Sequence, residues 1–292
     1  MSWRTIIISR RCKLDYKMGY MVVRAEDTKR VFLEEVAILL IENPAVSLTG
    51  CLLEELIRQK IKVIFCDSKR SPLAELVSYY GNHDSNKRIR MQIAWQKETK
   101  DLVWTKIVSE KIFRQAEFLR DLHFTAEHDL LQNYLKELKP ADLSNREGHA
   151  AKVYFNAVFG EDFYRGANDP VNAALDYGYT LILSAFNREI VANGYMTQLG
   201  IHHDNVFNHF NLSSDLMEPV RVMVDRRVFS LDPDEFEHWE KMELVSLLNA
   251  PVLISGNEQT LLNAIKIYVR SVLDALSQDD PEKIQFIQVY EL

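Results

Sequence analysis

The stretch YGNHDSN, residues 80–86, separates two parts of the chain that have different hydrophobic patterns. Its residues are polar or favour turns, which is typical of a connection between folded units. Short apolar runs precede it, whereas helical periodicity follows it almost to the C-terminus. We therefore expect an α+β protein with a small β-rich N-terminal domain (residues 1–78), a linker (79–90) and a large all-α domain (91–292).

Runs rich in β-branched and aromatic residues predict the strands of the N-terminal domain. The predicted strands are residues 3–9, 18–24, 36–41 and 62–66. Residues 50–59 place apolar side chains at helical spacing, so an amphipathic helix is expected there. Beyond the linker, a long charged segment from Lys87 to about Leu122 has helical periodicity. The further predicted helices are residues 126–138, 145–159, 169–192, 215–229, 236–248 and 258–277.

The charges are distributed unevenly along the chain. The net charge is −7, which argues against a uniformly basic nucleic-acid-binding protein. Residues 1–100 hold 18 Lys and Arg against 12 Asp and Glu, a net charge of +6, so the other 17 basic and 30 acidic residues give −13. Two interpretations follow: differently charged surfaces without a special role, or a basic half for phosphate contact and an acidic half for metal ions.

Several classes of protein are disfavoured by the sequence. Three cysteines that lie far apart predict neither a disulfide framework nor a zinc site. No apolar run approaches the roughly 20 residues of a membrane span, and the first residues lack the layout of a signal peptide, so a cytoplasmic protein is expected. The sequence also lacks a glycine-rich phosphate loop, a Gly-x-Ser-x-Gly elbow and a His-Glu-x-x-His motif.

Two segments of the helical part combine carboxylates with histidines. The first is SNREGHAA, residues 144–151, in which Ser144 and Glu147 have the spacing of a capping box at a helix start. In that interpretation Glu147 is a structural cap. Gly148 argues against it, because glycine in a first helical turn costs about 1 kcal/mol relative to alanine and would let another group approach the backbone of Glu147.

The second segment is GIHHD, residues 200–204, followed by SDLMEPVR, residues 214–221. Asp215 and Glu218 are three residues apart, so a helix would place both carboxylates on one face. Alternatively, these acids only complement a helix dipole. Taken with the first segment, the carboxylates and an imidazole form a donor set suited to Mg²⁺ or Mn²⁺. Such an ion promotes phosphodiester chemistry without a protein nucleophile.

In this combination and order, the motifs resemble the family of CRISPR-associated integrases, the adaptation subunit usually called Cas one. The matching features are NREGHAAKVYF, the NAALDYGY segment (residues 172–179), LGIHHDN and SDLMEPVR. The resemblance covers essentially the whole chain, and the opening SWRTIIIS looks most like the version in type II systems that operate with Cas nine. It implies an N-terminal domain that serves as a dimerisation scaffold and a catalytic helical domain.

By motif position, the resemblance implies that Glu147, His203 and Glu218 bind the catalytic divalent metal, Mg²⁺ or Mn²⁺. His203 is chosen over His202 because the family histidine follows the glycine by three positions. Asp215 matches a further acidic position and ranks below these three residues as a ligand. Three ligands of one ion are expected to converge within roughly 5 Å of a common point.

The resemblance further implies a reaction and a set of partners. The 3′-hydroxyl of a captured DNA fragment attacks a phosphodiester at the leader–repeat boundary, and a second attack completes insertion into the repeat array. The implied partners are double-stranded DNA, a second copy of the chain in a homodimer, a dimer of Cas two in a larger integration complex, and further type II adaptation subunits, with no membrane association.

Two alternatives remain open from the sequence. The same metal site would serve a nuclease that hydrolyses branched DNA, with water in place of the hydroxyl. A non-catalytic DNA-binding scaffold would use its acids only as helix caps. The residues that contact DNA are not determined: Lys87, Arg88 and Arg90 are reasonable phosphate contacts, but a solvated linker or helix face explains them equally well.

Overall fold

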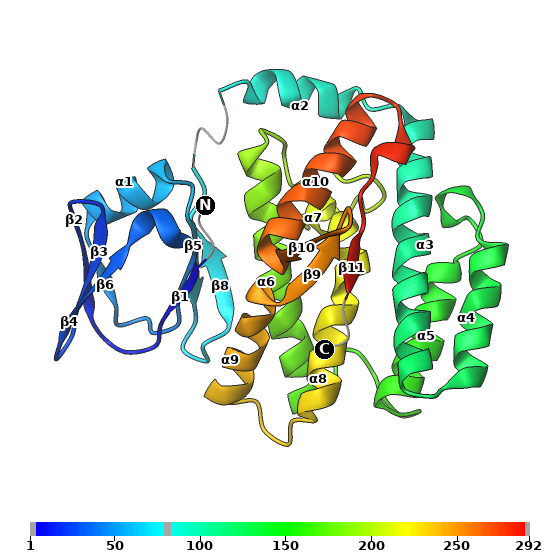
Figure 1. Ribbon diagram of the computed structural model, residues 1–292, viewed down its shortest axis with the longest axis horizontal. Coiled ribbons are helices and arrows are strands. Elements are labelled where there is room, and N and C mark those ends of the chain that lie inside the picture. Colours follow the sequence, from blue (N-terminus) through cyan, green and yellow to red (C-terminus); the bar gives the residue numbers. More distant parts are fainter. Residues whose placement is uncertain (1–3, 79–82, 290–292) are drawn as a thin grey trace. The chain divides into compact units, whose positions relative to one another are not determined.

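Two compact units make up the chain, residues 1–83 and residues 84–292. The computed structural model describes residues 4–78 and 83–289 (Figure 1). The first unit is β-rich and the second is mostly helical, which confirms the predicted fold class. Helix α2 (Ser85–Ile93) begins within the range predicted as the linker. Residues 79–82 of that linker lie outside the described residues.

The N-terminal unit contains two sheets and one helix. Its elements are β1 (Arg4–Ile8), β2 (Lys13–Lys17), β3 (Tyr20–Arg24), β4 (Thr28–Phe32), the 3₁₀ turn η1 (Leu33–Glu35), β5 (Val36–Ile41), β6 (Ser47–Leu48), α1 (Gly50–Arg58), β7 (Lys62–Cys66) and β8 (Pro72–Glu75). One sheet has the strand order β1-β5-β7-β8 and the other has the order β4-β3-β2-β6. Strands β1, β5 and β7 are parallel to one another, whereas β8 is antiparallel to β7.

The core of this unit lies beneath α1. Strand β5 is buried at every position, which is typical of a strand covered on both faces. Leu52 and Leu56 of α1 join a core that contains Leu14 of β2 and Leu39 of β5, so both sheets contribute to it. Thr49 caps the helix, because its hydroxyl accepts a hydrogen bond from the backbone N–H of Leu52 at 3.3 Å.

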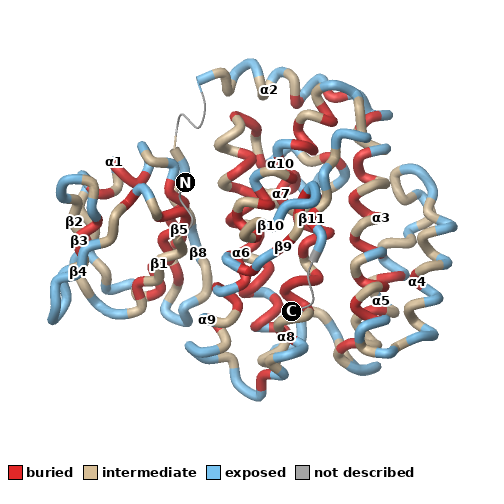
Figure 2. The backbone as a smooth tube through the Cα atoms, viewed as in Figure 1, coloured by how far each residue is buried: buried red, intermediate tan, exposed pale blue. Residues whose placement is uncertain are grey.

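The C-terminal unit is built around helix α3. Its other elements are α2, α4 (Thr125–Glu137), η2 (Pro140–Asp142), α5 (Arg146–Phe159), α6 (Pro170–Ala192), α7 (Asn211–Met217), η3 (Glu218–Val220), α8 (Arg221–Leu231), α9 (His238–Ser246), η4 (Leu247–Asn249), α10 (Leu261–Ser277) and η5 (Pro281–Lys283). Helix α3 (Lys97–Asp121) packs against α4, α5, α8, α10 and the turn η3 (Figure 1). Buried positions recur along α3 and α6 (Figure 2).

No helix in the described residues is long and apolar enough to cross a membrane.

A small sheet in this unit was not predicted from the sequence. Strand β9 (Pro251–Ile254) lies between β10 (Asn257–Thr260) and β11 (Ile287–Val289), and both neighbours pair with it antiparallel. The start of the helix predicted at 258–277 therefore belongs to β10. The turn before it is set by Ser255 and Gly256, which both have positive φ. Strands of three or four residues show too few periods to be recognised in a sequence.

The long helix predicted from Lys87 to Leu122 is two helices, α2 and α3. An anchor for a distant loop lies just before the break, at the end of α2. The side-chain amide of Gln92, in α2, donates to the backbone carbonyls of Met196 and Leu199 at 2.9 Å each, and the backbone N–H of Met196 donates back to it at 2.9 Å. This contact fixes the start of the loop that carries the two adjacent histidines.

Candidate active site

Glu147 lies in the first turn of α5, but it does not cap the helix. The cap comes from Asp142, whose carboxylate accepts hydrogen bonds from the backbone N–H groups of Arg146 at 2.7 Å and Glu147 at 2.9 Å. Asn145 precedes the helix in the left-handed conformation and makes no side-chain cap. The capping box suggested by Ser144 and Glu147 is therefore wrong, and the Glu147 carboxylate is available for another partner.

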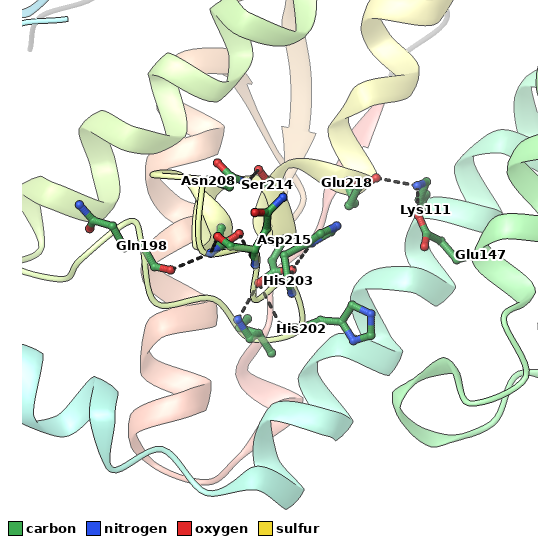
Figure 3. Close-up of polar contacts among 12 residues, drawn as sticks. Lys111, Glu147, Gln198, His202, His203, Asn208, Ser214, Asp215 and Glu218 are labelled. Atoms are coloured by element: carbon green, nitrogen blue, oxygen red, sulfur yellow. Dashed lines mark hydrogen bonds and ion pairs between the residues drawn. The ribbon is translucent and has the colours of Figure 1, made fainter. Parts of the chain in front are cut away.

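That partner is the ammonium of Lys111, which lies between two carboxylates (Figure 3). The Nζ atom of Lys111, on α3, lies 2.5 Å from Oε1 of Glu147 and 2.6 Å from Oε2 of Glu218. Only 10% of the Lys111 side chain and 5% of the Glu218 side chain are exposed. Three segments that are distant in sequence, α3, α5 and η3, thus meet at one buried cation.

Glu218 is held ionised by two cations. Burial alone would raise the pKa of its carboxyl, but the charges of Arg221 and Lys111 outweigh burial and keep that pKa below its ordinary value. A guanidinium nitrogen of Arg221 lies 3.1 Å from Oε1 of Glu218. The other oxygen, Oε2, lies 2.6 Å from the Lys111 ammonium and forms an ion pair with it. An ionised carboxylate that faces a cation position with this oxygen also suits a divalent ion.

His203 is positioned by the fully buried Asp215 (Figure 3). One oxygen of Asp215 lies 2.6 Å from Nδ1 of the His203 ring. The same carboxylate accepts the backbone N–H groups of Ile201 at 2.6 Å, His202 at 3.1 Å and His203 at 3.0 Å. Because Nδ1 is occupied by this contact, Nε2 is the ring nitrogen left to bind another group.

The two adjacent histidines have different environments. The ring of His202 stacks on Trp104 of α3, with 4.4 Å between centroids and an interplanar angle of 3°. The pKa of His203 is raised, first by its hydrogen bond with Asp215 and further by the charges of Asp215, Glu218 and Glu147, against the lowering effect of burial. The charges of both glutamates therefore act on the ring of His203, and the choice of His203 over His202 as a ligand stays a prediction.

The histidine loop depends on a glycine. A Cβ atom on Gly200 would lie 2.3 Å from the carbonyl oxygen of His203 and 2.8 Å from the carboxylate of Asp215, so no larger residue fits without moving the loop. Farther along, the loop projects outward: Val206 is 86% exposed and Phe207 is 87% exposed. The loop is therefore tightly held at its histidine end and exposed in its middle.

A cavity of about 250 Å³ adjoins the carboxylates. Cations contribute much of its lining, since Arg165 and Arg221 flank it together with Lys111. Both guanidinium groups lie over the ring of Tyr179, at 5.5 Å and 4.8 Å from its centroid. Tyr179 belongs to the NAALDYGY segment. The motif therefore included this residue of the cavity wall, although no role was assigned to it.

Asp225 forms a buried polar network at the edge of the same cavity. Its carboxylate accepts hydrogen bonds from the hydroxyls of Tyr154, at 2.9 Å, and Tyr179. Burial raises the pKa of Asp225 to about 6, against the lowering effect of the two tyrosine hydrogen bonds. Neither Asp225 nor Lys111 was singled out from the sequence, because each lies on a helix among many other charged residues.

The two glutamates and His203 form a donor set that fits a hard divalent ion. In this structure the Lys111 ammonium lies between the two carboxylates. Among residues 4–78 and 83–289, no group of three or more His, Cys, Asp and Glu side chains is gathered closely enough to form a metal site. Glu147 and Glu218 nevertheless converge on one cation position, and His203 is close enough for their charges to raise its pKa. Convergence of all three residues on a single ion stays a prediction.

Comparison with known proteins assigns the chain to a family. The family described as "CRISPR associated protein Cas1" matches residues 5–241, so the chain belongs to the Cas1 family. It is 28% identical to the CRISPR-associated endonuclease Cas1 of Neisseria meningitidis serogroup C (strain 8013), over all of this chain and 98% of that protein. This is the family that the sequence motifs indicated.

Solved structures share the fold at low sequence identity. A casposase bound to its integration product superposes with a TM-score of 0.75 and 18% identity, over 96% of this chain and 92% of that chain. A Cas6-RT-Cas1–Cas2 complex gives a TM-score of 0.75 and 19% identity, over 99% of this chain and 36% of that chain. The architecture described above is therefore the architecture of these proteins.

We predict that Gly200→Ala disrupts the histidine loop. The added methyl group overlaps the carbonyl oxygen of His203, so we expect a loss of about 1–3 kcal/mol in the free energy of unfolding. Gly50→Ala is the matched control, because a Cβ atom there meets nothing within 4 Å. Chemical denaturation of both variants checks this, and equal stabilities would contradict the overlap.

The raised pKa of Asp225 predicts a pH dependence of stability. A carboxyl whose pKa is higher in the folded state than its ordinary 3.8 stabilises the protein at low pH, and this contribution is lost as the pH rises towards 6. A shift of about two pH units corresponds to about 3 kcal/mol at most. Asp225→Asn should therefore gain stability relative to the wild type between pH 4 and pH 7.

Denaturation curves measured across this pH range test the prediction. The exposed Asp234→Asn is the control and should follow the wild-type profile. If Asp225→Asn and the wild type show parallel profiles, the carboxyl of Asp225 does not titrate in this window in the folded protein.

Proposed function

We propose that this protein is the integrase subunit of CRISPR adaptation, a divalent-metal-dependent enzyme that inserts captured DNA fragments into the repeat array. The reaction is transesterification, in which the 3′-hydroxyl of a fragment displaces a strand at the leader–repeat boundary. One observation carries this proposal. Glu147 and Glu218 come from separate segments and face one buried cation position, with the ring of His203 held nearby.

Glu147, His203 and Glu218 are the residues that would hold Mg²⁺ or Mn²⁺. Two carboxylates and one imidazole nitrogen suit such an ion. When bound, the ion would supply positive charge to the phosphodiester oxygens and orient the attacking hydroxyl. Asp215 is a positioning residue in this proposal, because its carboxylate is already engaged by three backbone N–H groups and by the His203 ring.

The other side chains of the cavity serve to bind and orient DNA. Arg221 and Arg165 line the cavity beside the carboxylates, where guanidinium groups can pair with phosphate oxygens. The Nε atom of Arg221 is buried and has no hydrogen-bond acceptor. Asp225 and Tyr179 fix the wall on which both guanidiniums stack. The polar wall therefore offers cations for a phosphodiester next to the proposed metal position.

The relatives support the same assignment. The Neisseria meningitidis relative is named an endonuclease, and the casposase of similar fold is described as bound to its integration product. A further structure of this fold is a complex that contains Cas2. We accordingly propose double-stranded DNA and a Cas2 dimer as partners, with the chain acting as a homodimer through its β-rich N-terminal unit. Further type II adaptation subunits belong to the same proposal.

Two other functions are compatible with part of these observations. Hydrolysis of branched DNA would use the same residues with water as the nucleophile, and the endonuclease name of the relative favours keeping it as a second candidate. A scaffold whose acids only cap helices is disfavoured, because Asp142 supplies the cap at Glu147. The two enzymatic reactions differ in whether a new strand junction forms.

We predict that Glu147→Gln and His203→Ala each abolish strand joining. The assay mixes the chain and its Cas2 partner with a short duplex that has 3′-hydroxyl ends and a supercoiled plasmid that carries the repeat array. Each variant loses one proposed metal ligand, so we expect joining to fall by at least about 100-fold. EDTA should stop the wild-type reaction.

Glu161→Gln is the matched control, because this exposed acid lies outside the site and should keep full activity. Cleavage of branched DNA without any junction would favour the nuclease. Joining that persists in EDTA, or in both folded variants, would refute the proposed metal site.

A further inference from the structure

Lys111 has no part in the reaction proposed above, yet it occupies the centre of the site. Its ammonium contacts both glutamates that are proposed as metal ligands, and its side chain is almost fully buried. With carboxylate oxygens at 2.5 Å and 2.6 Å from its Nζ atom, this lysine is an ammonium. The group at this position is therefore a cation, and it lies between the two carboxylates.

The backbone of Lys111 is firmly placed. It lies in the middle of α3, where Val108 and Ile112 are fully buried and fix the orientation of the helix. Because α3 packs against both α5 and η3, one lysine on this helix can reach a carboxylate from each of them. Two carboxylates that face each other, one of them buried, repel unless a cation lies between them, so the lysine stabilises the site when no other cation is bound.

A second position is available to the ammonium in the same cavity. Gln115 lies one helical turn after Lys111 and therefore on the same face of α3. Its side-chain oxygen is buried and has no hydrogen-bond partner. Both side chains line the cavity of about 250 Å³. An ammonium that leaves the carboxylates thus has a neutral acceptor nearby.

We propose that Lys111 is the resident cation of the two glutamates and that a divalent ion binds by displacing its ammonium from at least one of them. This proposal rests on the function proposed above, because it takes Glu147 and Glu218 as metal ligands. Metal binding then exchanges the Lys111 ammonium for a divalent ion at the two glutamates. The lysine holds the carboxylates together before the metal arrives and weakens the affinity for the metal.

The exchange predicts two effects of opposite sign for Lys111→Met. Without the ammonium, the buried Glu218 keeps only Arg221 as a charged partner and the partly exposed Glu147 loses its ion pair, so the melting temperature in EDTA should fall. The same change removes the competing cation and its repulsion, so Mn²⁺ should bind more tightly, by about tenfold or more. If Lys111 serves only as a structural ion pair, Lys111→Met should lower both the stability of the protein and its affinity for Mn²⁺.

The experiment measures Mn²⁺ binding by isothermal titration calorimetry and unfolding in EDTA, both on the full chain. Lys111→Arg retains the charge and should keep affinity at or below that of the wild type. Lys241→Met is the matched control, since this buried lysine lies over Tyr177 and Phe236, outside the lining of the cavity. It should change stability without changing Mn²⁺ affinity. Lys111→Gln replaces Lys111→Met if the latter does not fold.

The outcomes separate this proposal from the proposed function. If the wild type binds Mn²⁺ and Glu147→Gln abolishes binding, but Lys111→Met binds no more tightly, the exchange is refuted and the metal site stands. If neither the wild type nor Lys111→Met binds Mn²⁺, both proposals fail. Tighter binding by Lys111→Met together with a lower melting temperature in EDTA supports the exchange.

Discussion

The C-terminal unit depends on the burial of charged groups in a helical core. Lys111, Asp215, Glu218 and Asp225 are all nearly inaccessible to solvent, and a charge in such a place is tolerated only with compensating partners. Their partners come from different segments: Glu147 from α5, the histidine loop before α7, and tyrosines from α5 and α6. Because the pairings of Lys111 and Asp225 join elements far apart in sequence, satisfying these charges also fixes how the helices are arranged.

The fold was predictable wherever burial is expressed as a continuous pattern. The fully buried strand β5 and the helices α5 and α6 coincide closely with their predicted segments. Strands β2 and β4 were missed because their residues are largely polar; β4, with the sequence TKRVF, has three exposed positions. The sheet β9–β11 was missed because its strands are too short, and the break before Lys97 was missed because Ala94, Trp95 and Gln96 include no glycine or proline to mark it.

Motif order pointed to the acids and the histidine of the proposed site, but it did not indicate the contacts between them. Motif order selected Glu147, His203, Asp215 and Glu218, and the structure brings Glu147 and Glu218 to one ammonium and joins His203 to Asp215. A sequence does not show which of two nearby groups caps a helix, so Asp142 was overlooked. Lys111 was hidden for a related reason: it is one of many charged residues on a long helix, and only its burial distinguishes it.

Asp215 holds the histidine loop at one end, so the position of His203 does not depend on how long the rest of the loop is. The carboxylate binds residues at the near end of the loop, while Val206 and Phe207 extend into solvent. Residues added at Val206 and Phe207 are therefore expected to leave His203 in place. Across relatives, the distance along the chain from the histidine to the acidic pair should drift while its glycine and aspartate persist. A search pattern with a fixed gap at this point would overlook true members of the family.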